Sequence, residues 1–93
     1  MASQNVGSTC VNTAVSVGGT AVVLVDGSSN RESLTVHNAH ATQSLSIGGT
    51  AAVTLADGLR IVAGGTFTFS DYVGPLWGIA SGAATDVRVM EVL

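Results

Sequence analysis

The feature that most constrains this chain is a Gly-Gly-Thr step that occurs three times between segments rich in β-branched residues. The steps are Gly18-Gly19-Thr20, Gly48-Gly49-Thr50 and Gly64-Gly65-Thr66. Glycine weakens helix interiors and supplies the positive φ that tight hairpins need, so the steps disfavour long helices and predict hairpin turns. The threonine after each pair fits the pleated backbone of a resuming strand. The chain is therefore expected to be a series of short strands joined by tight turns.

The first two steps share a longer context. Residues 16–21 read Ser-Val-Gly-Gly-Thr-Ala and residues 46–51 read Ser-Ile-Gly-Gly-Thr-Ala, and each is followed by an apolar stretch that ends at Asp-Gly. A weak internal duplication would explain this similarity. Two β-hairpins that use the same turn chemistry independently would explain it equally well.

Most segments between the turns alternate between apolar and small polar residues, which is the period of a strand with one buried face. The alternating segments are 11–17, 33–37, 44–47, 52–56, 66–70 and 87–89. Residues 21–25 are apolar without alternation and are expected to be covered on both faces. The pattern predicts an all-β sandwich or small barrel of about eight short antiparallel strands, with jelly-roll and immunoglobulin-like connections both open.

The chain has 93 residues, which is the size of a single domain. Residues 1–10 are polar and are interpreted as a flexible N-terminal arm, and residues 11–93 as the β domain. The start lacks the cationic and apolar parts of a secretory signal, so synthesis in the host cytoplasm without a signal peptide is expected. The longest apolar run, residues 21–25, is far shorter than the roughly 20 residues of a membrane span, so no membrane partner is expected.

Charged residues are few. There are 3 Lys+Arg against 6 Asp+Glu, for a net charge of −3, and no lysine occurs. A nucleic-acid partner is therefore excluded as far as it depends on a basic patch, because phosphate affinity comes mainly from clustered cations. The single cysteine, Cys10, excludes an internal disulfide and a thiolate zinc cluster.

The two histidines, His37 and His40, are close in sequence, and Asp26 or Glu32 would be candidates to complete a metal site. Their spacing belongs to a strand end that runs into a loop, with no helical register to bring the rings together. We interpret them as solvated or interface residues. No metal and no other cofactor is expected.

No residue pattern points to catalysis. The six carboxylates could in principle supply an acid/base pair, but Asp26 and Asp57 each precede a glycine and are explained by turn formation. No Gly-x-Ser-x-Gly elbow occurs, and Cys10 has no neighbouring group that would activate a thiolate. We therefore expect that the chain is not an enzyme.

Tyr72 and Trp77 are the most informative single residues, because large aromatic side chains dominate both cores and binding surfaces. They lie in the segment Tyr72-Val73-Gly74-Pro75-Leu76-Trp77. Three interpretations of Trp77 remain open: a core residue, a subunit-interface residue, or a platform on which a sugar stacks.

The order of several β and turn segments resembles small β-rich virion proteins of tailed bacteriophages. Along the chain these segments are Arg31-Glu32-Ser33-Leu34-Thr35-Val36-His37-Asn38, Leu45-Ser46-Ile47-Gly48-Gly49, Val53-Thr54-Leu55-Ala56-Asp57-Gly58, Ala63-Gly64-Gly65-Thr66, Leu76-Trp77-Gly78-Ile79-Ala80 and Val87-Arg88-Val89-Met90-Glu91-Val92. The resemblance covers residues 31–93. Each segment is ordinary β chemistry, so the order of the segments carries the resemblance.

The resemblance implies a non-enzymatic structural protein of the virion. The favoured role is a capsid decoration (cement) protein on the capsid surface, which binds the assembled lattice of the phage major capsid protein and stabilises the head. A tail, baseplate or head-fibre component, and a host-glycan-binding module, are the alternatives. The protein is expected to form a homo-oligomer, with a trimer favoured over a dimer.

Two groups of contact residues are expected. The arm would bind the capsid protein through Ala2, Ser3, Gln4, Asn5, Val6, Gly7, Ser8 and Thr9. Tyr72, Leu76 and Trp77 would form the oligomer or capsid interface.

Overall fold

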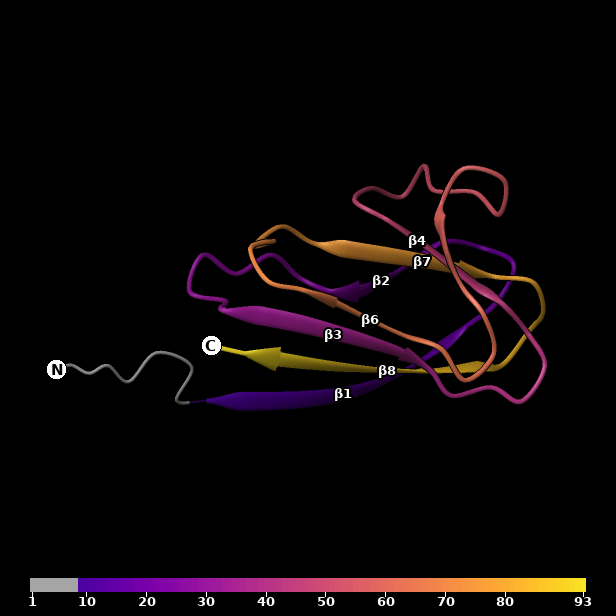
Figure 1. Cartoon of the computed structure of the whole chain (residues 1–93). Coiled ribbons are helices and arrows are strands. Elements are labelled where there is room, and N and C mark those ends of the chain that lie inside the picture. Colours follow the sequence, from indigo (N-terminus) through magenta and orange to yellow (C-terminus); the bar gives the residue numbers. More distant parts are fainter. Residues whose placement is uncertain (1–8) are drawn as a thin grey trace, which may run out of the picture.

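The computed structural model describes residues 9–93 and confirms an all-β sandwich in which eight antiparallel strands form two four-stranded sheets (Figure 1). In one sheet the strand order is β1-β8-β3-β6, and in the other it is β2-β7-β4-β5. The strands are β1 (Cys10–Val17), β2 (Val22–Val25), β3 (Ser33–Asn38), β4 (Leu45–Gly48), β5 (Leu59–Ile61), β6 (Thr66–Phe69), β7 (Leu76–Ala80) and β8 (Thr85–Val92).

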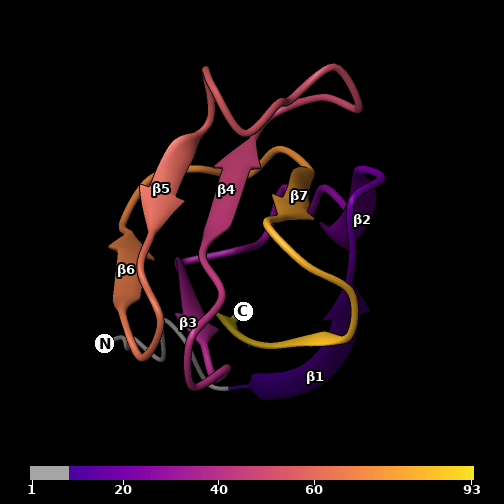
Figure 2. The same cartoon turned by 90° about the vertical axis from the view of Figure 1, so that its right-hand side faces the viewer.

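The connections are those of a jelly roll, which decides between the two topologies left open by the sequence. Every connection except that between β4 and β5 leads from one sheet to the other. Viewed from the end, β4, β7 and β2 lie on one side of the sandwich and β1 and β3 on the other (Figure 2). The first strand pairs along its whole length with the last, from Cys10 opposite Val92 to Val17 opposite Thr85. No helix in residues 9–93 is long and apolar enough to cross a membrane.

The core lies between the sheets and is built from the inward positions of the alternating segments. On β3, for example, Leu34 and Val36 are completely buried while Thr35 between them points outward. The buried cluster consists of Val17, Leu24, Leu34, Val36, Leu45, Ile47, Ile61, Leu76, Ala80, Val87 and Val89. The period of two therefore located most of the core correctly.

The first and third Gly-Gly steps lie between strands and the second begins at Gly48, the last residue of β4, but none of the three forms a tight hairpin. The first connects β1 to β2 and the third connects β5 to β6, and both connections pass between sheets. Among the glycines of residues 9–93, only Gly64 has a positive φ, at 78°. The prediction of tight hairpin turns is wrong for two reasons. At the first and third steps the chain crosses to the other sheet, and at the second step a loop of residues 49–58 separates β4 from its neighbour β5.

Two strand predictions also need correction. Residues 52–56 form a loop, and its Val53 is buried against the outer face of the second sheet. This close approach requires glycine, since a Cβ added at Gly48 would lie 2.9 Å from Val53 Cγ2 and one added at Gly58 would lie 2.8 Å from the same atom. Residues 21–25 are not covered on both faces, because β2 is an edge strand and Val23 is 40% exposed.

A buried arginine fastens one end of the sandwich. The guanidinium of Arg31 forms an ion pair with Glu91 on β8, with Nη2 2.8 Å from Oε2, and the Arg31 side chain has no exposed surface. The remaining donors bind backbone carbonyls in two loops: Nη1 donates to Tyr72 (3.2 Å) and Gly74 (2.8 Å), and Nη2 donates to Asp26 (2.6 Å). Arg31 thus connects the β2–β3 loop, the β6–β7 loop and the last strand.

A buried asparagine has the corresponding role at the opposite end of β3. The side-chain amide of Asn38 donates to the carbonyl oxygens of Gln43 (2.8 Å) and Ile61 (3.0 Å), and its Oδ1 accepts the N–H of His40 (3.1 Å). Because a buried amide is costly unless its groups are paired, these bonds fix the β3–β4 loop against the end of β5.

Candidate interaction surfaces

Both histidines form hydrogen bonds within the protein, His37 to the neighbouring strand β6 and His40 to its own loop. His37 Nδ1 lies 2.8 Å from the hydroxyl of Thr66 on the neighbouring strand. His40 Nδ1 accepts the backbone N–H groups of Thr42 and Gln43, both at 3.0 Å. Within residues 9–93, no three His, Cys, Asp or Glu side chains come together in a way that could hold a metal ion.

Three carboxylates are each engaged with a different structural partner. Hydrogen bonds from the N–H and hydroxyl of Thr54 lower the pKa of Asp57 below its usual range. On β8, a two-pronged hydrogen bond from Arg88 (2.8 and 2.7 Å) lowers the pKa of Asp86. Glu91 pairs with Arg31. These carboxylates therefore support local structure and do not face one another across a cleft.

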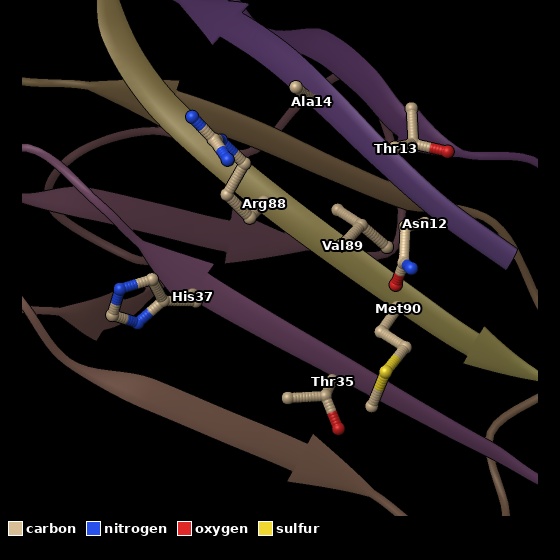
Figure 3. A pocket seen from close by; sticks show the side chains of 8 residues that line it. All are labelled: Asn12, Thr13, Ala14, Thr35, His37, Arg88, Val89 and Met90. Atoms are coloured by element: carbon tan, nitrogen blue, oxygen red, sulfur yellow. The ribbon is translucent and has the colours of Figure 1, made fainter. Parts of the chain in front are cut away.

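A shallow groove of about 460 Å³ runs across the outer face of the sheet that contains β1, β8 and β3. Its lining residues are Asn12, Thr13, Ala14, Thr35, His37, Arg88, Val89 and Met90. In Figure 3 the side chains of Arg88, His37 and Met90 lie over these strands, with Asn12 towards the β1 edge. An open groove with mixed polar and apolar lining can receive an extended chain or a loop, and it does not enclose a small molecule as a typical ligand pocket does.

The three expected interface residues lie in different environments. Trp77 is half-buried on β7, opposite Val23 on β2, and is not part of the buried core cluster. Leu76 is only 2% exposed and belongs to the core, which removes it from the set of contact residues available to a partner. Tyr72 is half-buried against the core, and its hydroxyl donates to the Pro75 carbonyl at 2.5 Å. Of these three residues, only Trp77 therefore lies partly exposed on a strand of a sheet face.

The expected arm falls almost entirely outside the described part of the chain. Residues 2–8 lie there, so a contact between them and a capsid remains a prediction. Thr9 is described, and its backbone exchanges hydrogen bonds with Leu93 (3.3 and 2.7 Å), which extends the pairing of β1 with β8 by one residue.

The sequence did not reveal the apolar side chains that remain exposed on the sandwich. They are Val11, Val23, Leu55, Leu59, Val62, Phe67, Val73 and Met90. Several belong to edge strands, where an inward position is covered from one side only. Alternation predicts the face on which a side chain lies, but whether a strand is an edge depends on pairing that alternation does not encode.

No protein-family model and no curated protein matches this chain. Two solved structures share its fold. The stem and receptor-binding domain of the spike protein P1 from bacteriophage PM2 has a TM-score of 0.64 and 14% identity, over 88% of this chain and 32% of that one. A protein of the Bacillus endospore appendages, described as a family of disulfide-linked pili, has a TM-score of 0.51 and 11% identity, over 91% of this chain and 86% of that one.

At these identities the likeness is one of fold. The chain spans about a third (32%) of the length of the PM2 spike protein chain. Both similar proteins are structural, one a spike and the other a subunit of pili. The phage spike agrees with the broad class of β-rich virion and surface proteins, and it does not single out tailed phages.

Proposed function

We propose that the chain is a non-enzymatic structural protein of a bacteriophage particle, and that it acts as a decoration protein on the assembled capsid. The observation that carries the proposal is the jelly-roll likeness to a phage spike protein over 88% of the chain. The separate structural roles of Asp57, Asp86 and Glu91 also support a protein that acts through its surfaces.

The mechanism in this proposal is linkage between binding and assembly. A homo-oligomer that binds the assembled capsid lattice, and not the free capsid subunits, shifts the equilibrium towards the shell in proportion to its concentration and affinity. Residues 2–9 provide one contact with the capsid protein. The apolar surface of Trp77 and Val23 on the outer face of the second sheet provides the other.

A role in host recognition is the second candidate, as part of a tail, a head fibre or a glycan-binding module. It is favoured by the groove over β1, β8 and β3, where Asn12, His37 and Arg88 supply hydrogen-bonding groups. A pilus-like chain of disulfide-linked subunits is disfavoured for these 93 residues, because they contain one cysteine. One thiol can join two chains but cannot link a continuous row of them.

Occupancy on purified capsids of the phage that encodes the protein tests the decoration role. We expect the full chain to co-sediment with capsids, and we expect deletion of residues 2–9 or the substitution Trp77→Ala to reduce the bound amount while the β-type circular dichroism stays unchanged. Val62→Ala, which trims an exposed apolar residue in the β5–β6 connection, is the matched control and should bind as the parent does.

Failure of the full chain to bind capsids would overturn the decoration role. If the deletion variant and Trp77→Ala both bind capsids as well as the parent does, neither residues 2–9 nor Trp77 contacts the capsid protein. Sugar binding on a glycan array that Arg88→Ala in the groove weakens would favour host recognition instead.

A further inference from the structure

Within residues 9–93, the outer edge of β1 is the least protected strand edge of the sandwich. β1 is eight residues long, lies at the edge of its sheet and pairs with β8 in an unbroken register. It contains no charged residue and no proline. Natural proteins usually shorten, bulge or charge such edges, because a long unpaired strand is a template for another chain.

The hydrogen-bonding phase of β1 shows which backbone groups are available. Thr9 and Leu93 exchange both of their backbone hydrogen bonds. Bonded and non-bonded pairs alternate in an antiparallel ladder, so Val11, Thr13, Val15 and Val17 direct their N–H and C=O groups at β8. The intervening residues, which are Cys10, Asn12, Ala14 and Ser16, direct theirs at the free edge.

The other strand edges of residues 9–93 offer less. β2 has four residues and an irregular register between Val23 and Val25. β5 has three residues and carries Arg60, and β6 has four. The β6 strand of a second copy could also pair with β1. Because alternate residues face a strand edge, the four residues of β6 would pair with only about half of the backbone groups that β1 presents.

We propose that a second copy of this chain pairs with β1, antiparallel, about a two-fold axis at Thr13. In this register Cys10 faces Ser16 and Asn12 faces Ala14 of the other copy, so all four outward-directed residues are paired through about eight hydrogen bonds. Neighbouring registers leave at least one of the four unpaired. A two-fold, isologous contact is also the commonest form of homo-oligomer.

Side chains and charge both favour a second copy as the occupant. The register places Val11, which is 38% exposed, opposite Val15 of the other copy on the inner face of the joined sheet. Each chain carries a net charge of −3, and an uncharged strand lets two such chains approach without placing like charges opposite one another. The pairing gives a dimer, whereas the resemblance favours a trimer. The proposal does not depend on whether the protein decorates a capsid.

Disulfide trapping tests the register. In a Cys10→Ser background, Thr13→Cys places one thiol from each copy at the axis, in a non-hydrogen-bonded pair with Cα atoms about 4.5 Å apart, which suits a disulfide. We expect mild oxidation to convert most of this variant to a covalent dimer. Ser16→Cys in the same background is the matched control, because its two thiols lie about 20 Å apart in this register, and it should remain uncross-linked.

Light scattering of the unmodified chain supplies the second measurement, with a dimer mass expected. Ala14→Pro removes an N–H that points at the free edge and leaves the ladder with β8 intact, so it should shift the protein to monomer with unchanged circular dichroism. A monomeric parent, a trimer, or equal cross-linking of the Thr13→Cys and Ser16→Cys variants would each overturn the proposal.

Discussion

At the scale of single residues, Arg31 does the most to hold separate parts of the chain together. Its guanidinium satisfies one carboxylate and three loop carbonyls inside the protein. A buried ion pair adds little stability by itself, because both charges lose their hydration. Removing one member leaves the other buried without compensation, which is far more costly.

We therefore predict that Arg31→Ala lowers the free energy of unfolding by about 3–5 kcal/mol, because it leaves Glu91 unpaired with only 14% of its side chain exposed. The measurement is urea denaturation followed by tryptophan fluorescence. Arg88→Ala is the control, since it removes an exposed ion pair with Asp86 and should change stability little.

The double variant Arg31→Met with Glu91→Leu should regain much of the loss, because neither charge then remains buried. A single Arg31→Ala variant as stable as the parent would show that the ion pair and its carbonyl contacts contribute nothing to the fold.

The sequence did not reveal these internal contacts. Arg31 was one of only three basic residues and stood before a strand, but three of its four partners lie 41, 43 and 60 positions further along the chain. Leu76 was expected at an interface and is in the core. Contacts between residues so far apart depend on strand pairing, which local periodicity does not specify.

At the scale of elements, the repeated Gly-Gly-Thr context occupies two different environments. A Cβ added at Gly18 would meet its nearest neighbour, Ala83, at an ordinary 3.7 Å, whereas one added at Gly48 would lie 2.9 Å from Val53. The first site lies in the connection from β1 to β2, which leads from one sheet to the other, and the second lies under the β4–β5 loop. The structure thus gives the two similar segments different roles.

This difference predicts opposite outcomes for matched substitutions. Gly48→Ala should destabilise the protein by about 1–3 kcal/mol, because the added methyl group overpacks the contact with Val53. Gly18→Ala has no positive φ and no close neighbour, so its melting temperature should equal or exceed that of the parent. Equal destabilisation by both variants, measured by thermal denaturation, would contradict this explanation.

The strands were largely predictable because alternation is a local property. The connections between them were not predictable, because they depend on which strands pair. Residues 52–56 alternate as a strand does, yet they form a loop because Asp57 and Thr54 bond to each other and Val53 packs across Gly48 and Gly58. Tertiary packing overrode the local pattern at this position.

At the scale of the whole molecule, nearly all strand pairing joins segments that are distant in sequence. β1 pairs with β8, β2 with β7, and β3 with both β8 and β6. Closing such large loops costs entropy before the contacts form, which slows the folding of proteins of this kind.

We predict that the chain refolds on a time scale of about milliseconds to seconds, as all-β sandwiches do. Trp77 is the single tryptophan and lies half-buried on β7, so stopped-flow fluorescence reports formation of the second sheet. Refolding in microseconds would contradict the dominance of distant pairing.

The pairing of the first strand with the last also orders events during synthesis. β1 leaves the ribosome long before β8 is translated, so both edges of an uncharged eight-residue strand stay unpaired until β8 emerges. Nascent chains on neighbouring ribosomes of one messenger RNA would then expose the same strand at the same time. The late arrival of β8 makes the speed of translation between β1 and β8 a determinant of whether these chains mature or aggregate.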